Sequence, residues 1–353
     1  MNKSITVTGL DIGSSKIAAV IARIDRDGRL DIAGFATGEA GGIDRGMLVD
    51  LNDSIDSVSR VLTKLKGKAS RVTGEIYVNI SGEDVRGAKS VGMVPISLRG
   101  REIAAPDIEN SVNAASTIHL PFDREIIHRV VHSFSIDDQP WIKNPLGLYA
   151  SRLACETYVV TANMNHIQSI HKCVNDAGYD VKDIAFTGIA SGVSLLDKET
   201  KESGAVLVDI GNSLTEISIF LGGVLDSFDI ISLGGRDAGS DFRSSALFNK
   251  LISAISASLQ DLSKRSVGPQ SIILTGGYAL TDGVIEFLEE KLSHPVKMGT
   301  LRGTQGDISG LDGVRLATAI GLCGYAYEKK LALTSSPAKR IHAKVVEIFN
   351  NYF

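Results

Sequence analysis

The amino-acid sequence predicts an α/β fold of two similar lobes, with a smaller α+β insertion in the first lobe. The chain has 353 residues, more than one ordinary hydrophobic core accommodates. The stretch TGLDIGSSKI at 8–17 recurs as LVDIGNSLTE at 207–216. Each copy begins three predicted strands that an amphipathic helix follows. The repeat therefore covers whole β-hairpin-plus-helix units, which indicates an internal duplication.

The first copy begins with strands predicted at 4–12, 16–25 and 30–39. Their β-branched, partly alternating composition and the Gly-containing turns between them indicate strands. A helix is predicted at about 50–66. Its apolar residues recur at the spacing of one helical face: Leu51, Ile55, Val58, Leu62 and Leu65.

Material that the second half lacks follows the strand GEIYVNISG at 74–82. Residues 84–161 read as a small α+β insertion. It is predicted to contain a strand, a helix and two long strands, at 86–97, 105–118, 124–136 and 152–162. A helix at about 164–177 leads back to the main fold.

The second copy repeats the plan with strands predicted at 204–210, 214–223 and 224–235. A helix at about 244–264 follows. The remaining elements are a buried strand, two helices and a short linker, predicted at 270–277, 281–292, 313–329 and 331–337.

Each Asp-x-Gly hairpin predicts an anion-binding turn, because successive backbone N–H groups line its concave side. Gly13 and Gly211 allow the backbone to approach a phosphate closely. Asp11 and Asp209 would point into the cleft and hold Mg²⁺ through water, since this ion keeps several waters. The other predicted phosphate-facing residues are Ser14, Ser15, Lys16, Asn212 and Ser213. Two such hairpins facing each other would hold a triphosphate from both sides.

The glycine pair Gly276–Gly277 after the third buried strand would let a base and ribose lie against the backbone. No G-x-x-x-x-G-K-[ST] loop and no G-x-G-x-x-G fingerprint occur, so the sequence argues against those nucleotide-binding folds. His128 and His132 alternate as on a strand, about 13 Å apart, too far to share a zinc ion.

The net charge of −4 gives no reason to expect attraction of the whole protein to nucleic acid. Cys155, Cys173 and Cys323 have no CxxC spacing and are expected to be buried, reduced thiols. No signal peptide and no run of about 18 apolar residues is present. A cytoplasmic protein is expected, unless a segment attaches it to a membrane surface.

Residues 338–353 suggest such a segment. Apolar residues recur at the spacing of one helical face: Ile341, Val345, Ile348, Phe349 and Tyr352. Basic residues gather at the start of the segment: Lys339, Arg340, His342 and Lys344. The last residue is Phe353. A basic amphipathic helix with terminal aromatic residues suits an anionic membrane surface. The alternative is a terminal helix packed on the protein's own core.

These motifs resemble the actin–Hsp70–sugar kinase superfamily. The phosphate motifs match GLDIGSSK and LVDIGNSLTE, and the adenosine motif matches IILTGGYAL. Within the superfamily the chain closely resembles the FtsA family of bacterial cell-division proteins. That resemblance extends to IYVNISG, VGMVPIS, DREIIHRVVHSFSID, IKNPLGLYASRL, IAFTGIASGVSLL and ATAIGLCGYA.

The resemblance implies an actin-like (ribonuclease H-like) two-lobed ATPase fold that binds ATP and Mg²⁺, with weak or no ATPase activity. It implies a peripheral location on the inner face of the cell membrane, filaments or dimers, and FtsZ or an FtsZ-like partner. Carried over by position, Thr215 joins the phosphate-facing residues, and Gly276 and Gly277 face the adenosine. No catalytic residue is assigned.

The resemblance also divides the chain. Subdomain 1A comprises 1–83 and 162–200, the inserted subdomain 1C comprises 84–161, and subdomain 2A comprises 201–309. The return helix, the linker and the membrane-targeting helix are expected at 310–330, 331–337 and 338–353.

Two features depart from the family pattern. The second hairpin reads D-I-G-N-S-L-T-E where the family reads D-I-G-G-G-T-T-D. Residues 236–271 form little more than one helix where the family places a whole subdomain, 2B.

Two other functions are weighed against a division scaffold. A PilM-like pilus or secretion scaffold would recruit a membrane protein's cytoplasmic tail instead of FtsZ. A metabolite kinase would need a second pocket with a catalytic Asp, which the sequence does not reveal.

Overall fold

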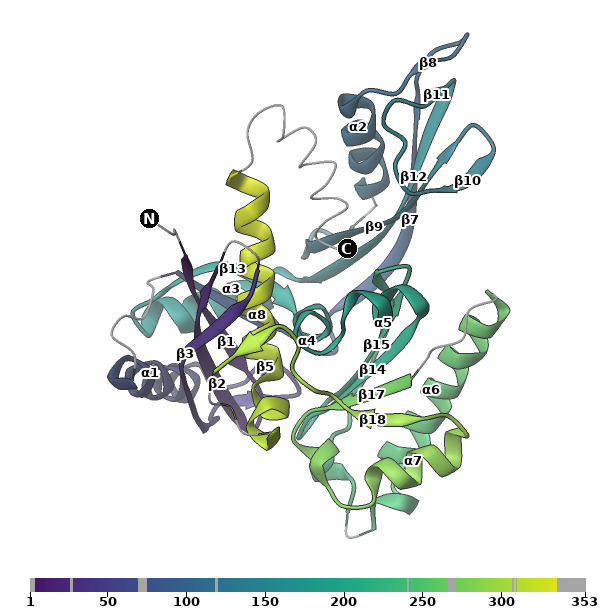
Figure 1. The fold of residues 1–353 in the computed structure, drawn as a ribbon. Coiled ribbons are helices and arrows are strands. Elements are labelled where there is room, and N and C mark those ends of the chain that lie inside the picture. The colour runs from purple at the N-terminus through teal and green to yellow at the C-terminus, as the bar shows by residue number, and fades with distance from the viewer. Residues whose placement is uncertain are drawn as a thin grey trace.

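A computed structural model describes residues 4–25, 28–68, 75–117, 120–239, 241–265, 271–306, 308 and 310–334. The first lobe is built on a six-stranded sheet in the order β13-β6-β1-β2-β3-β19 (Figure 1). Its strands are β1 (Ile5–Ile12), β2 (Lys16–Ile24), β3 (Leu30–Glu39), β6 (Glu75–Ile80), β13 (Asp180–Phe186) and β19 (Thr304–Gln305). β1, β2 and β3 form an antiparallel meander, and β6 is parallel to β1.

The second lobe repeats this arrangement in a five-stranded sheet of order β16-β15-β14-β17-β18. Its strands are β14 (Ala205–Ile210), β15 (Thr215–Leu221), β16 (Val224–Ile231), β17 (Ser271–Thr275) and β18 (Val296–Met298). β14, β15 and β16 form the meander, and β17 is parallel to β14. The duplication predicted from the two hairpin motifs is confirmed by the equivalent pairing.

Two helices, α4 (Thr187–Leu195) and α8 (Gly310–Thr334), lie between the two sheets (Figure 1). α8 packs directly on β1, since a Cβ on Gly9 would lie 2.1 Å from the carbonyl oxygen of Ala319. α8 continues to Thr334, so the linker predicted to begin at 331 is wrong for 331–334, which are helical. Residues 331–334 read LALT, and the helix extends through them because leucine and alanine have high helix propensity.

The outer faces of the sheets carry amphipathic helices. α1 (Leu51–Lys68) and α3 (Met164–Asp176) belong to the first lobe, and α6 (Ala246–Lys264) and α7 (Val284–Leu292) belong to the second. Each buries one apolar stripe, which for α6 includes Leu247, Leu251, Ile255 and Leu262. α5 (Lys198–Ser203) precedes β14, and the short β4 (Ile43–Asp44) and β5 (Met47–Leu48) form a hairpin before α1.

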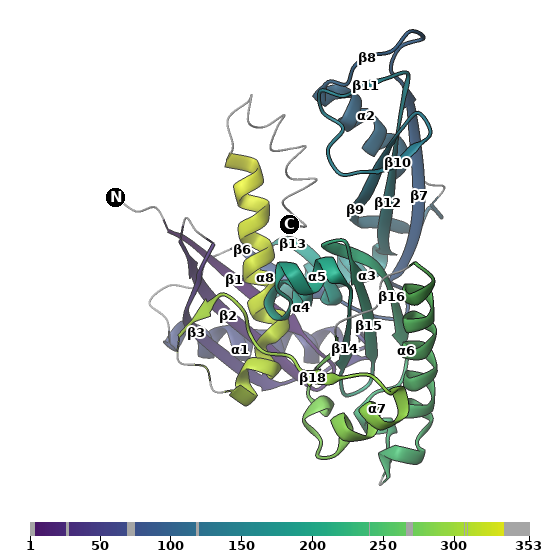
Figure 2. The ribbon, with the colours of Figure 1, turned by 45° about the vertical axis from the view of Figure 1, so that its right-hand side comes forward.

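The insertion projects from the two lobes as a separate layer, as both views show (Figures 1 and 2). Its sheet has the order β10-β9-β12-β7 and is covered by α2 (Ala105–Ser116). The strands are β7 (Arg86–Pro95), β9 (Arg124–Ile136), β10 (Gln139–Ile142) and β12 (Arg152–Asn163), and β8 (Arg101–Glu102) pairs with β11 (Tyr149–Ala150). It has a small hydrophobic core of its own, which includes Ile108, Phe134 and Leu153.

The segment between β16 and β17 is short, as predicted. It contains two 3-10 turns, η1 (Gly235–Asp237) and η2 (Phe242–Ser244), followed by α6. No helix among the described residues is both long and apolar enough to cross a membrane. The residues predicted to contact the membrane, from Lys339 to Phe353, lie outside the described part of the chain.

The three cysteines are buried and none forms a disulfide, as predicted. Burial raises the pKa of Cys173 to about 11 and that of Cys323 to about 12. These thiols are therefore packing groups and not reactive nucleophiles.

Candidate functional site

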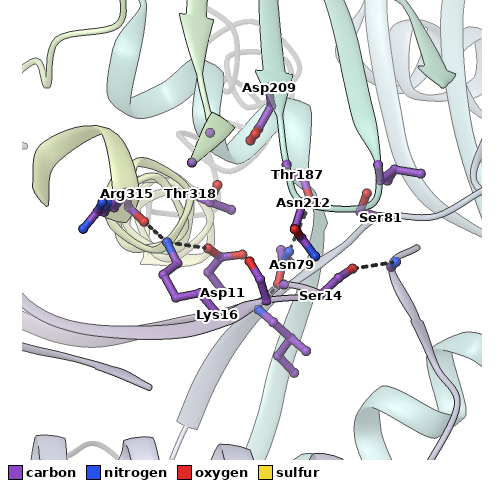
Figure 3. A pocket seen from close by; sticks show the side chains of 18 of the residues that line it. Asp11, Ser14, Lys16, Asn79, Ser81, Thr187, Asp209, Asn212, Arg315 and Thr318 are labelled. Carbon is purple, nitrogen blue, oxygen red and sulfur yellow. Dashed lines mark hydrogen bonds and ion pairs between the residues drawn. The ribbon is translucent and has the colours of Figure 1, made fainter. Parts of the chain in front are cut away.

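A cavity of about 660 Å³ lies where the two duplicated hairpins face each other (Figure 3). It is lined by the predicted residues Asp11, Gly13, Ser14, Ser15, Lys16, Asp209, Gly211, Asn212, Ser213, Gly276 and Gly277. Thr215 is the predicted residue that does not line the cavity. Its buried hydroxyl donates to the carbonyl oxygen of Leu233 at 2.9 Å, so it contacts its own lobe instead.

The two hairpins have equivalent geometry. The amide of Gly13 donates to the carbonyl oxygen of Lys16 at 3.1 Å, and that of Gly211 donates to Leu214 at 3.0 Å. A Cβ on either glycine would lie 2.9 Å from the same carbonyl oxygen. The glycines are therefore required by the tight turn itself, in addition to any approach by a ligand.

The turns contain backbone amides that have no acceptor among the described residues. Within the described part of the chain, the amides of Ser14, Ser15 and Asn212 donate no hydrogen bond. Successive unpaired amides in a turn form an anion-binding concavity. The residues present thus fit a phosphate chain.

Three carboxyl groups share the floor of the cavity: Asp11 at the end of β1, Asp209 at the end of β14, and Glu216 on β15. Burial, reinforced by the neighbouring Asp11 charge, raises the pKa of Asp209 to about 6. Burial also raises the pKa of Asp11, and burial together with Asp209 raises the pKa of Glu216 well above its usual range. Carboxylates crowded in this way favour a bound cation or a proton.

Lys16 supplies a positive charge at the rim. Its Nζ lies 3.9 Å from Asp11 Oδ2 and donates to the carbonyl oxygen of Arg315 on α8. The donor set of Asp11 and Asp209 suits Mg²⁺, which takes one or two carboxylates and fills its remaining positions with water and phosphate oxygens.

The glycine pair after β17 has two distinct roles. Gly276 has φ +89°, and a Cβ there would lie 2.3 Å from Asp209 Oδ1, so this position tolerates only glycine. A Cβ on Gly277 would meet no atom within 4 Å, so this face of the backbone is open for a flat ligand group. Tyr278 lines the cavity beside it.

The substituted positions of the second hairpin bond across the cleft. The hydroxyl of Ser213 accepts the amide of Arg45 at 3.0 Å, and Glu216 Oε1 accepts the hydroxyl of Ser81 at 2.8 Å. Arg45 and Ser81 belong to the first lobe, and both hairpin residues belong to the second. The hydroxyl of Ser213, predicted to face phosphate, is therefore already engaged by the protein.

Several lining residues were not predicted from the sequence. The side chain of Asn79 accepts a hydrogen bond from the amide of Ile12 at 2.7 Å and donates one to Thr187 at 3.2 Å. These bonds fix the end of β1, where the first hairpin begins, against the start of α4. Asn79 lies near the end of β6, within IYVNISG, and a polar residue in an otherwise apolar strand is a usable signal. Arg315 and Thr318 come from α8, and no local motif places them in the cavity.

Comparison with known proteins places these features in context. The family model for the SHS2 domain inserted in FtsA matches residues 82–161, which form the projecting insertion. The cell division protein FtsA of Pseudomonas aeruginosa is 27% identical, with 92% of this chain and 90% of the relative covered. FtsA of Borreliella burgdorferi is 27% identical with 95% of each covered, and FtsA of Escherichia coli K12 is 31% identical with 67% and 56% covered.

Solved structures show the same fold at low identity. The PilM–PilN complex of type IV pilus biogenesis has a TM-score of 0.65 at 15% identity, covering 90% of this chain and 97% of that one. The ethanolamine utilization protein EutJ from Carboxydothermus hydrogenoformans has a TM-score of 0.52 at 14% identity, covering 90% and 89%. The fold is the actin-like ATPase fold predicted from the sequence.

Proposed function

Because this chain belongs to the FtsA family, we propose that it is an actin-like cell-division protein that binds Mg-ATP between its lobes and acts at the inner face of the cell membrane. The observation that carries the nucleotide part is the cavity itself. Two equivalent turns with amides that are unpaired within the described part of the chain, two half-buried aspartates and an open glycine backbone meet around a cavity of about 660 Å³.

In this proposal the amides of Ser14, Ser15 and Asn212 bind phosphate oxygens, and Lys16 adds a compensating charge. Asp11 and Asp209 hold Mg²⁺ through water, and the ion neutralises the phosphate charge. Because the two turns belong to different lobes, a bound triphosphate joins the lobes.

The membrane part rests on residues 338–353, whose basic start and apolar face suit an anionic lipid surface. We propose that this segment attaches the protein peripherally, and that the attached protein recruits FtsZ or an FtsZ-like partner and self-associates into filaments or dimers. The described residues of 236–271 form two short turns and α6, so we propose that other surfaces supply much of the partner contact.

Sedimentation with anionic vesicles tests both parts. The full chain and a version ending at Pro337 are mixed with phosphatidylglycerol-containing vesicles, each with and without Mg-ATP. We expect only the full chain to pellet, and more of it with Mg-ATP, because bound nucleotide promotes self-association. An Asp209→Asn variant of the full chain should lose the increase, whereas Asp229→Asn, at an exposed position of β16, should keep it.

Pelleting of both versions, or of neither, would contradict the membrane role of the tail. If Mg-ATP does not increase the pelleting of the unmodified full chain, ATP-driven assembly would be contradicted. Co-pelleting of FtsZ, compared with co-pelleting of a pilus protein's cytoplasmic tail, then identifies the partner class.

A further inference from the structure

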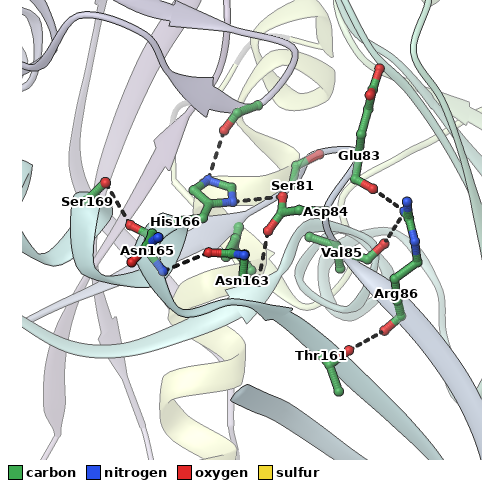
Figure 4. Close-up of polar contacts among 12 residues, drawn as sticks. Ser81, Glu83, Asp84, Val85, Arg86, Thr161, Asn163, Asn165, His166 and Ser169 are labelled. Atoms are coloured by element: carbon green, nitrogen blue, oxygen red, sulfur yellow. Dashed lines mark hydrogen bonds and ion pairs between the residues drawn. The ribbon is translucent and has the colours of Figure 1, made fainter. Parts of the chain in front are cut away.

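His166 on α3 is a buried imidazole that takes no part in the cavity. Its side chain is 1% exposed, and it lies between two oxygen atoms (Figure 4). Nδ1 is 3.0 Å from Asp84 Oδ1, and Nε2 is 3.1 Å from the carbonyl oxygen of Gly46. The side chain therefore joins two segments that are far apart in the sequence.

Both partners of His166 are hydrogen-bond acceptors. Burial opposes ionisation of Asp84, but the hydrogen bond and charge of His166 and the amide of Asn163 outweigh it, so the pKa of Asp84 is lowered. A backbone carbonyl cannot donate. A ring that carries a proton on each nitrogen donates to both acceptors, so the two contacts match the imidazolium form of His166.

The Gly46 end of this contact reaches both phosphate hairpins. Gly46 follows Arg45 at the tip of the β4–β5 hairpin. The Arg45 amide donates to Ser213 in the second lobe at 3.0 Å, and the Gly46 amide donates to Ser14 in the first lobe at a longer 3.4 Å. The position of this tip thus affects both anion-binding turns.

The Asp84 end lies at the base of the insertion. Asp84 Oδ2 accepts the amide of Asn163, the last residue of β12, at 3.0 Å. Its carbonyl oxygen accepts Arg124 Nη2, from the first residue of β9, at 2.6 Å. Asp84 is therefore bonded to the two long strands that carry the insertion.

We propose that His166 is a positioning residue that couples the inserted domain to the nucleotide cavity, through Asp84 at one end and the Arg45–Gly46 tip at the other, while its ring is doubly protonated. The coupling is reciprocal, so a partner bound to the insertion changes nucleotide affinity as nucleotide changes the insertion. This inference rests on the proposed nucleotide function.

Loss of one ring proton breaks the connection, because a neutral imidazole has a single N–H for two acceptors. The other charged groups near this contact are Glu83 and Arg45, which pair at 4.0 Å, together with Arg86, Asp123 and Arg124. The His166 ring itself bonds to Asp84 and to Gly46, so the connection depends on its two N–H groups.

Hydrogen–deuterium exchange with and without Mg-ATP tests the coupling. In the unmodified protein at pH 6.5, nucleotide should slow exchange at the turns 13–16 and 211–214, at 43–48, and at the insertion strands 124–136 and 152–163. In His166→Gln the slowing should remain at the turns but fall about fivefold or more at the insertion strands. His171→Gln, on the same helix, should behave as the unmodified protein does.

A wild-type pH series serves if His166→Gln does not fold. Ring-nitrogen NMR follows the protonation of His166. Transmission to the insertion should be present while both ring nitrogens carry a proton and should disappear once one proton is lost. Undiminished transmission in His166→Gln, or in the wild type after that proton is lost, would overturn the inference. Absence of protection at the turns in the wild type would instead refute nucleotide binding.

Discussion

Asp226 on β16 is a charged residue that connects the insertion to the second lobe. Its side chain is 5% exposed and receives two hydrogen bonds from Arg265, at 2.7 and 2.6 Å. Lys89 of β7 lies 3.5 Å away, and His132 Nδ1 of β9 lies 3.9 Å away. One carboxylate thus joins the end of α6 to two strands of the insertion.

Asp226→Asn is expected to lower stability at neutral pH. Burial opposes ionisation of Asp226, but the hydrogen bonds from Arg265 and the charges of Lys89, Arg265 and His132 outweigh it, so its pKa is lowered. A lowered carboxyl pKa contributes stability that is present above the unfolded-state pKa of about 4 and is lost as pH falls through the folded-state pKa. We expect a cost of roughly 2 kcal/mol at pH 7.

Thermal unfolding between pH 3.5 and 8 measures this effect. The difference between Asp226→Asn and the unmodified protein should be constant from pH 8 to about 5 and should shrink below about pH 4. Asp229→Asn, exposed on the same strand, should change little at any pH. An equal difference at pH 3.5 and pH 7 would exclude the ion pairs as its source.

At the scale of elements, the contact between α4 and α8 depends on small residues. A Cβ on Gly321 of α8 would lie 1.8 Å from the carbonyl oxygen of Ala190 on α4. Gly188 and Gly192 of α4 pack in the same way against Ser218 and Phe220 of β15. The two helices therefore fill the narrow space between the sheets with their backbones.

Gly321→Ala is expected to destabilise the protein by about 1–3 kcal/mol or more, because the added methyl group forces the two helices apart. Gly67→Ala is the matched control. It is the penultimate residue of α1, a Cβ there would meet no atom within 4 Å, and alanine should raise the stability of the protein by up to about 1 kcal/mol. Unfolding temperatures of the two variants should move in opposite directions; equal shifts would contradict the packing argument.

Helices and strands whose apolar residues recur with a clear helical or alternating period were predicted close to their observed bounds. α6, expected at 244–264, is Ala246–Lys264, and β9 is Arg124–Ile136 as expected. α4 was not assigned, because eight of its nine residues are buried and it has no polar face to create a helical period. The β4–β5 hairpin was also missed, since each of its strands has two residues and carries no alternation.

At the scale of the whole molecule, the two lobes are joined around the cavity by contacts between protein groups. Arg236 Nη1 of the second lobe lies 2.6 Å from Asp44 Oδ1 of the first. The Arg45–Ser213 and Ser81–Glu216 hydrogen bonds lie nearby. A ligand that touches both hairpins adds to these contacts and stabilises both lobes together.

Mg-ATP is therefore expected to raise the unfolding temperature of the whole protein. At one hundred times its dissociation constant, a ligand that binds only the folded state adds about 2.7 kcal/mol. Chelation of Mg²⁺ by EDTA should reverse most of the shift, because the phosphates then face Asp11 and Asp209 without a cation. Adenosine without phosphates is the control; an equal shift with adenosine would show that the hairpins do not bind phosphate.

The sequence by itself determined the duplicated two-lobed fold and the place of the insertion. It also identified residues at the cavity: eleven of the twelve residues predicted to face the nucleotide line it, and Thr215 does not. These features depend on local patterns, such as strand alternation, helical period and tight turns, which a chain expresses over a few residues. Only the tertiary structure showed that Ser213 and Glu216 bond across the cleft and that His166 links Asp84 to Gly46. Their partners lie 168, 135, 82 and 120 positions away, so no local pattern specifies them.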